Sequence, residues 1–221
     1  MELNDVMRTT FAADFTDAPV SDATLFDILD VARFAPSGGN RQGNRVVIVR
    51  EATTKDALAE LAAPAAKRYA AQIKAGENPW NAVIPTKASE ADIAATVPPA
   101  QLTESFRRAP VVLVFLVDLR VVASMDQYLD RVGMISGASI YPFVWNVLLA
   151  ARQAGLGGTI TTLPIAEEPK LQALLGAPAH FAVAAVVPLG QPQKQLTKLR
   201  RKPVAEIATV GRFDGPAFKK P

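Results

Sequence analysis

Residues 33–44 read Arg33-Phe34-Ala35-Pro36-Ser37-Gly38-Gly39-Asn40-Arg41-Gln42-Gly43-Asn44. Apolar residues recur at helical spacing over 25–32, and Ser21 or Asp22 is placed to cap the first turn of that helix. Pro36 disfavours helical geometry at the residue before it, so the helix is predicted to end there. Residues 45–49 are rich in β-branched side chains and predict a buried strand. The quoted stretch is therefore a loop between a helix and a strand.

The composition of this loop suits a binding function. Its three glycines allow positive φ angles or a close approach of the backbone to a ligand. Ser37, Asn40 and Gln42 supply neutral donors and acceptors that can read the edge of a heterocycle. An ordinary glycine-rich turn has the same composition, and composition alone does not separate the two interpretations.

Length and composition limit the possible functions. The chain has 221 residues, enough for a sizeable core, and residues 1–221 are predicted to form a single domain. The absence of cysteine excludes disulfides, thiolate nucleophiles and cysteine metal sites, and with one histidine no metal site is expected. Lysine and arginine number 24 against 21 acidic residues, without a long basic run, so no nucleic-acid partner is expected.

One segment has the length of a membrane span. Residues 132–151 carry no charge, but they include Gly133, Pro142 and Asn146, and a helix buried in protein is the favoured interpretation. The first residues are too charged for a signal peptide. We therefore expect a soluble cytoplasmic protein without a membrane partner.

The rest of the chain predicts further helices and strands. Asp126 and Asp130 are expected to be solvated acids. The predicted elements are a helix over 53–75 with a break or kink near Pro64, a strand over 111–117, a short polar helix over 119–131, a helix over 135–154 kinked at Pro142 and buried nearly all round, a strand over 159–163, a helix over 169–175 and a strand over 181–187.

The order of residues in the opening loop is more informative than its composition. Pro-Ser-Gly-Gly-Asn-Arg-Gln over 36–42, after an amphipathic helix and before a hydrophobic strand, resembles the FMN-binding segment of the nitroreductase family. Two other segments resemble that family in the family's order: Ala150–Thr159, which contains Gly-Leu-Gly at a helix end, and 181–190, a hydrophobic strand that ends in Leu-Gly. The resemblance implies that FMN is bound by Pro36, Ser37, Gly38, Gly39, Asn40 and Gln42, and that Gly157, Gly158 and Thr159 bring backbone amides to the flavin ring.

The resemblance also implies a clamp for the flavin phosphate. Arg8-Thr9-Thr10 is similar to the family's Arg-x-Ser element, with threonine in place of serine. Residues 194–221 form a basic C-terminal arm, in which Arg201, or else Arg200, would close on the phosphate. A solvated terminus is the alternative at both ends. Many family members have a second arginine where this chain has Ala13-Asp14-Phe15, a departure that weakens the expected clamp.

The implied fold is α+β, with a mixed, mainly antiparallel sheet flanked by helices, assembled as a homodimer that holds two FMN molecules at the subunit interface. The implied activity is a ping-pong transfer of a hydride from NADPH or NADH through flavin N5 to a nitroaromatic, a quinone or a similar small acceptor. No protein side chain is expected to be catalytic, because the flavin carries the hydride. The alternatives are a specialised branch that fragments flavin or removes halogens reductively, and a protein that binds or sequesters flavin without turnover.

Residues 77–100 are expected to be an irregular insertion or lid on the substrate side. They contain four prolines and Trp80, and long irregular segments in compact domains commonly serve as covers or binding loops. Trp80 either stacks on flavin or substrate or packs on its own loop; the sequence leaves both open.

Overall fold

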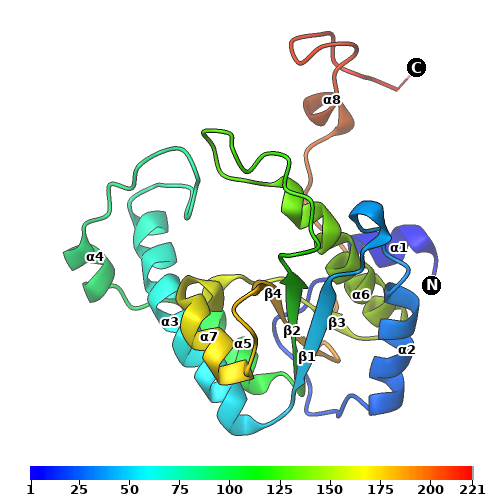
Figure 1. The fold of residues 1–221 in the computed structure, drawn as a ribbon, viewed down its shortest axis with the longest axis vertical. Helices are drawn as coiled ribbons and strands as arrows, with labels where there is room; N and C mark the ends of the chain where they lie inside the picture. The colour runs from blue at the N-terminus through cyan, green and yellow to red at the C-terminus, as the bar shows by residue number, and fades with distance from the viewer. Residues whose placement is uncertain (221) are drawn as a thin grey trace.

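A computed structural model describes residues 1–220 of the chain, in which one antiparallel sheet lies between two groups of helices (Figure 1). The fold class expected from the sequence is confirmed. The helices are α1 (Leu3–Arg8), α2 (Asp22–Ala32), α3 (Ala52–Lys74), α4 (Glu90–Ala95), α5 (Gln101–Arg108), α6 (Tyr141–Gln153), α7 (Glu168–Leu175) and α8 (Val204–Ile207); the 3-10 turns are η1 (Gly38–Asn40), η2 (Ile135–Ser139) and η3 (Leu163–Glu167); the strands are β1 (Asn44–Val49), β2 (Val111–Asp118), β3 (Gly157–Gly158) and β4 (Phe181–Gly190).

The sheet within residues 1–220 has the strand order β1-β2-β4-β3, so β1 and β3 form its opposite edges. Every residue of β2 is buried, as expected for a central strand that is apolar throughout. At one end of the sheet Asn44 pairs with Val117, and at the other end Gly158 pairs with Leu189. Strand β1 pairs with β2 from Asn44–Val117 to Val49–Val112, whereas β3 pairs only with the last residues of β4. The start of β1 and strand β3 therefore lie at opposite ends of the sheet.

Side chains of β2 alternate between two hydrophobic clusters, one on each face of the sheet. Val111, Leu113 and Phe115 pack with α2 and α6, whereas Val112 and Val114 pack with α3, α5 and α7. Figure 1 shows these helices on the two sides of the sheet. Burial on both faces makes the centre of the sheet a fixed frame for the loops at its ends.

The helix ends follow the expected capping chemistry. Ser21 caps α2 by accepting a hydrogen bond from the amide of Thr24. Gly155 after α6 and Gly176 after α7 have φ angles of 81° and 64°, the left-handed conformation that commonly ends a helix.

One prediction about proline was wrong, and a predicted break at a second proline is absent. Pro142 does not kink a long helix; it lies in the first turn of α6, where a missing N–H costs nothing, and η2 precedes it. Pro64 does not break α3, which continues to Lys74. Because Pro64 is exposed, water can satisfy the carbonyl group that loses its partner.

The predicted helix over 119–131 is absent from the described chain, where this segment forms turns. Asp126, expected to be solvated, is buried and accepts hydrogen bonds from the amide of Met134 and from Arg131 at 2.7 and 2.8 Å. The Met134 hydrogen bond, the largest contribution, holds the pKa of Asp126 below its ordinary value. A side chain that bonds to a backbone eight residues away competes with helix formation.

Three further expectations needed correction. The predicted strand over 159–163 was wrong: β3 ends at Gly158, η3 begins at Leu163, and between them the described chain has one isolated bridge, from Thr161 to Val186. The segment 77–100 is not wholly irregular, since α4 lies within it behind a capping box formed by Ser89 and Asp92. Helix α6 is not buried all round, because Tyr141 and Trp145 are partly exposed.

None of the helices in residues 1–220 combines the length and hydrophobicity needed to cross a bilayer.

Candidate functional site

The N-terminal segment and β3 lie side by side at one corner of the sheet. The amide of Gly158 donates to the carbonyl of Thr10 at 3.0 Å, and the amide of Ala12 donates to the carbonyl of Gly158 at 3.1 Å. Thr9 and Thr10 are buried, whereas Arg8 is exposed. The structure thus brings together two of the predicted flavin-binding elements, 8–10 and 157–159.

Glycine is required at both positions of β3. A Cβ on Gly157 would lie 2.8 Å from the Cβ of Ala12, and a Cβ on Gly158 would lie 2.7 Å from the carbonyl oxygen of Pro188. Real Cβ atoms essentially never make such contacts. Packing inside the chain therefore accounts for these two glycines before any ligand is considered.

Arg152 at the end of α6 adds a second guanidinium group to this corner, and the sequence interpretation missed it. Its Nε donates to Oγ1 of Thr9 at 2.8 Å, while the Thr9 hydroxyl donates to the carbonyl of Asp5 at 2.6 Å. Arg152 is the only charged residue in the sequence of α6, which is the signal that could have identified it. Arg8 and Arg152, together with threonine hydroxyls, give this corner the chemistry of an anion site.

The loop over 36–42 is held in a defined but strained conformation. Ser37 Oγ accepts from the amide of Gln42 at 3.0 Å, and Ser139 Oγ accepts from the amide of Gly38 at 3.1 Å. Asn40 and Gln42 have φ angles of 53° and 51°, in the left-handed region that side chains other than glycine rarely adopt. Strain of this kind concentrates at ligand-binding sites. Pro36, Gly38, Gly39, Asn40 and Gln42 are all exposed, so the loop presents polar groups to its surroundings.

An ion pair in the neighbouring turn, residues 118–121, supports the loop. The guanidinium of Arg120 forks onto both carboxylate oxygens of Asp118 at 2.7–3.3 Å and lowers the pKa of Asp118 to about 2. This turn packs against Gly43, where a Cβ would lie 2.6 Å from Val121. Arg41 donates to the carbonyl of Val121 at 3.4 Å. The 118–121 turn therefore fixes the place where the loop joins β1.

The loop and the anion corner lie far apart in a single chain. The start of β1 is level with Val117 and Ala182, whereas Gly158 is level with Leu189, and two strands lie between the two edges. Standard strand spacings place the start of β1 and Gly158 roughly 25 Å apart. One copy of the chain thus does not bring the predicted flavin-binding elements into one site.

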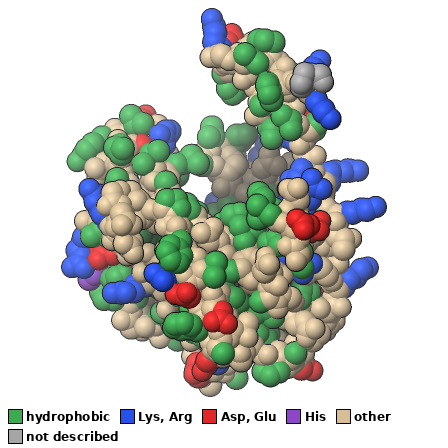
Figure 2. Space-filling view, turned by 90° about the vertical axis from the view of Figure 1, so that its right-hand side faces the viewer, with side chains coloured by type: hydrophobic (Ala, Val, Ile, Leu, Met, Phe, Trp, Pro, Cys, Tyr) green, Lys and Arg blue, Asp and Glu red, His purple; other side chains and the backbone are tan. Residues whose placement is uncertain are grey.

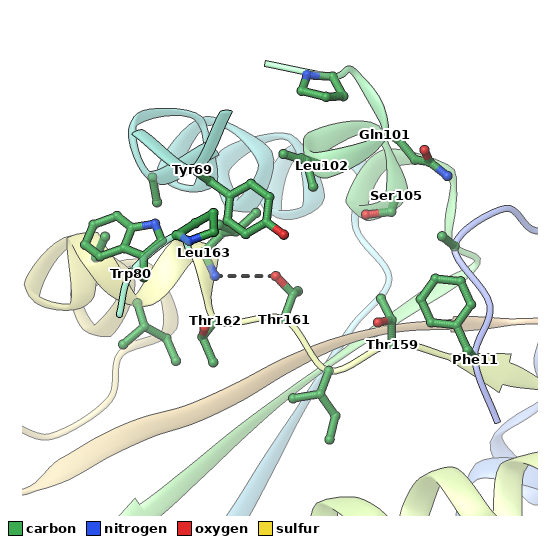
Figure 3. Close-up of a pocket in the computed structure, with 17 residues that line it drawn as sticks. Phe11, Tyr69, Trp80, Gln101, Leu102, Ser105, Thr159, Thr161, Thr162 and Leu163 are labelled. Atoms are coloured by element: carbon green, nitrogen blue, oxygen red, sulfur yellow. Dashed lines mark hydrogen bonds between the residues drawn. The ribbon is translucent and has the colours of Figure 1, made fainter. Parts of the chain in front are cut away.

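A cavity of about 900 Å³ opens next to the anion corner. Figure 3 shows Phe11 and Thr159 on one side of it and Tyr69 and Trp80 on the other. The walls come from α3, α5, η3 and the segment after β3, and among the described residues that line the cavity none has a charged side chain. The volume is at the upper end of the range for small-molecule sites.

Arg200 and Arg201 belong to the C-terminal arm, whose end around α8 stands off from the body of the molecule (Figures 1 and 2). Both are exposed, and Arg201 donates to the carbonyl of Arg200 at 2.9 Å. The arm begins beside the anion corner of its own chain, where Nε2 of Gln195 donates to the carbonyl of Thr9 at 2.6 Å. The role of Arg200 and Arg201 stays a prediction.

Comparison with known proteins identifies the family. The model of the nitroreductase family matches residues 8–191. An NADH dehydrogenase of Thermus thermophilus is 31% identical over 191 residues, which cover 86% of this chain and 85% of that protein.

Two further similarities involve iodotyrosine deiodinases. Iodotyrosine deiodinase 1 of Homo sapiens is 47% identical over 65 residues, which are 28% of this chain but 22% of the deiodinase, so that match is local. The crystal structure of an oxidized iodotyrosine deiodinase bound to FMN and 3-iodo-L-tyrosine superimposes with a TM-score of 0.65 at 19% identity and covers 96% of this chain and 99% of that one. The fold, the motif order and the match over 8–191 show that this chain belongs to the nitroreductase family.

Proposed function

We propose that the protein is an FMN-dependent oxidoreductase that passes a hydride from NADH or NADPH to a small acceptor such as a quinone or a nitroaromatic compound, in a ping-pong mechanism. The observation that carries this proposal is the junction of the anion corner, formed by Arg8, Thr10 and β3, with the uncharged cavity. An anion site beside an apolar cavity fits a phosphorylated, flat heterocycle and a second flat molecule above it. Bound FMN supplies the acceptor and donor of the hydride at N5.

The residues of the chain bind and orient the cofactor and its partners. Arg8 and Arg152 neutralise the phosphate, and the Thr10 hydroxyl supplies a neutral donor beside them. The Thr9 hydroxyl, which donates to the carbonyl of Asp5, holds Arg152 in place. In the proposed complex the backbone at Thr159, which lines the cavity next to this corner, lies against the edge of the ring. Gly157 and Gly158 are buried behind it, and the Gly158 amide donates to the carbonyl of Thr10. Donors at the edge of the ring tune the electron affinity of a flavin.

A homodimer completes the site. Ser37, Asn40 and Gln42 lie too far from Arg8 to act on the same flavin within one chain, so the loop of one copy serves the site of the other. A groove of about 740 Å³ between α1, α2 and α6, which includes Val31, Leu149 and Ala150, provides apolar surface for such a contact. Trp145 and Tyr141 extend this surface along α6. The C-terminal arm begins beside Thr9 of its own chain, where Gln195 is bound, and its Arg201 or Arg200 closes on the phosphate.

The absorbance spectrum of the purified protein tests the proposal. We expect a flavin spectrum, which bleaches on anaerobic titration with NADH or NADPH and returns when a quinone is added. A protein that takes up no FMN even from an excess of it would overturn the proposal. Binding of FMN without any oxidation of NADH or NADPH would instead support a flavin-sequestering protein.

Reductive dehalogenation is the second candidate, favoured by the local identity with the human deiodinase. The chemistry of the cavity argues against an amino-acid substrate, because its described lining offers no charged partner for an ammonium or a carboxylate group. Incubation of the reduced protein with 3-iodo-L-tyrosine decides between the two. We expect no release of iodide, and rapid release would favour the second candidate.

A further inference from the structure

Trp80 has a backbone conformation that its surroundings must enforce. Within residues 1–220, three residues other than glycine have positive φ angles: Asn40, Gln42 and Trp80, the last at 54°. The first two belong to the predicted flavin loop. A bulky aromatic residue is a stronger outlier in this region than asparagine, and such outliers point to functional positions.

Two side chains hold Trp80 in this conformation. Gln72, buried in the last turns of α3, accepts the Trp80 amide through Oε1 at 3.0 Å and donates from Nε2 to Glu77 at 3.3 Å. Glu77 also accepts from the amide of Lys87 at 2.6 Å and from the hydroxyl of Thr86 at 2.9 Å. These donors, the Lys87 amide first, lower the pKa of Glu77, so the carboxylate is charged at neutral pH. The pair ties both ends of the 77–87 loop to α3.

Trp80 lines two hollows, an uncharged cavity and a smaller hollow that includes Arg68. It lines the large cavity opposite Phe11 and Thr159 (Figure 3), and it lines a smaller hollow together with Arg68 and Gln72. The guanidinium carbon of Arg68 lies 5.2 Å from the centre of the ring, within the range of a cation–π contact. The side chain of Trp80 is half-exposed, which leaves ring surface free for a ligand.

The polar groups in the cavity are hydroxyls and an amide. They come from Tyr69, Gln101, Ser105 and the threonines at 159, 161 and 162. Such groups can donate to a nitro or carbonyl oxygen, but they cannot neutralise a carboxylate that has lost its water. The lining therefore favours uncharged ligands over carboxylates.

We propose that Trp80 is a specificity-determining wall that stacks on flat, uncharged aromatic acceptors, and that Gln72 and Glu77 are positioning residues that hold it there. The proposal rests on the proposed function, because it assigns the acceptor side of the same site. In this proposal the segment 77–100 covers the cavity and contacts the acceptor through Trp80.

Steady-state kinetics with a matched pair of acceptors tests the charge preference. The acceptors 4-nitrobenzamide and 4-nitrobenzoate differ in charge and hardly in shape. We expect wild-type kcat/KM to be at least about tenfold higher for the amide. Equal values, or a preference for the benzoate, would overturn the assignment of uncharged acceptors.

Substitution of Trp80 tests the wall. W80A should raise the KM for 4-nitrobenzamide by about three- to tenfold, the usual size of an aromatic stacking contact. W80F, which keeps an aromatic ring, should have a KM close to that of the wild type. Ferricyanide has no flat ring to stack, and the reduction of flavin by NADH is common to both acceptors, so the ratio of kcat/KM for 4-nitrobenzamide to that for ferricyanide should fall in W80A by about the same factor. A W80A protein with unchanged KM for the amide would contradict the proposal.

Variants of Gln72 and Glu77 need a measurement that a change in protein stability alone would not affect. Q72L and E77A should raise the KM for the amide as W80A does and should lower the ratio of kcat/KM for the amide to that for ferricyanide. E77Q should have a smaller effect because its amide oxygen still accepts hydrogen bonds. E60Q replaces an exposed carboxylate on the same helix and is the matched control. If Q72L and E77A lower only the Tm and leave the KM of the amide unchanged, the pair has no positioning role.

A binding measurement separates this proposal from the proposed function. The chain has two tryptophans, so a W145F protein reports the fluorescence of Trp80 alone. Saturable quenching by 4-nitrobenzamide, weaker with 4-nitrobenzoate and weaker again in W145F/Q72L, supports the wall even if flavin turnover fails. Absence of quenching in a protein that binds and reduces flavin would overturn the wall and leave the proposed function intact.

Discussion

Two glycine-containing segments carry the family resemblance, and the structure gives them opposite surroundings. Gly157 and Gly158 are buried, and a Cβ at either position would collide with neighbouring atoms of the same chain. Gly38 and Gly39 lie in an exposed loop where a Cβ would meet side-chain atoms no closer than 3.4 Å. The packing of its own chain requires glycine in one segment, whereas the other segment is exposed and has room for a Cβ.

The same contrast separates the two halves of the proposed flavin site. The corner around Arg8 and Gly158 is rigid because strand pairing and the Arg152 contact to Thr9 fix it. The loop at Asn40 and Gln42 has the strained backbone and exposed amides of a surface that a ligand or a partner completes. We propose that a second copy of the chain completes a site split in this way.

The largest effect is expected from alanine at Gly158. The added Cβ must displace the carbonyl group of Pro188, so G158A should lower the free energy of unfolding by about 1–3 kcal/mol. G38A adds the same group where there is room and should change it by less than about 0.5 kcal/mol. Urea denaturation followed by circular dichroism checks both values. Equal destabilisation by the two variants would erase the distinction between the segments.

The next effect concerns the arginines of the phosphate clamp. R8A and R201A should each weaken FMN binding by about 1.5–3 kcal/mol, on the order of 10–100-fold, because each loses a charged hydrogen bond. R212A removes an exposed arginine of the same tail and serves as the control for R201A. Fluorescence titration of the apoprotein with FMN measures the affinities. Unchanged affinity in R8A and R201A would remove both residues from the site.

A smaller effect is expected from lowering the pH, which acts through Asp118 in the turn that supports the loop. Asp118 has its pKa lowered from 3.8 to about 2 by Arg120, so its charged form stabilises the folded state. This contribution is complete above the ordinary pKa and is lost as the pH falls toward about 2. The Tm of D118N should therefore be lower than wild type at neutral pH and should approach it near pH 2. D17N, at an exposed position, is the control; a constant difference between D118N and wild type at all pH values would contradict this account.

Local sequence chemistry predicted the parts of the fold that depend on neighbouring residues. Ser21 capping α2, the apolar run of β2 and the glycine ends of α6 and α7 were all visible in the sequence. Pro142 was misplaced because proline has the same sequence appearance at a helix start as inside a helix. The turns over 119–131 could not be predicted, since they depend on Asp126 bonding to a backbone eight residues away.

The candidate site was predictable where it follows a linear motif. The motifs identified Arg8–Thr10, 36–42 and 157–159, but the spatial separation of the loop from the other two follows from strand register and order, which no single segment encodes. Arg152 and the Gln72–Glu77 pair were missed because their roles are contacts between distant or differently folded segments.

The assembly of one flavin site from two chains can be tested directly with a mixed dimer. R8A in one copy and S37A/N40A in the other should each weaken FMN binding when present alone in both copies. In the mixed dimer, purified through two different tags, one site combines both defects and the other combines the intact Arg8 with the intact loop. We predict one FMN per dimer bound with wild-type affinity; a mixed dimer without any wild-type site would show that each chain builds its site alone and would contradict the account.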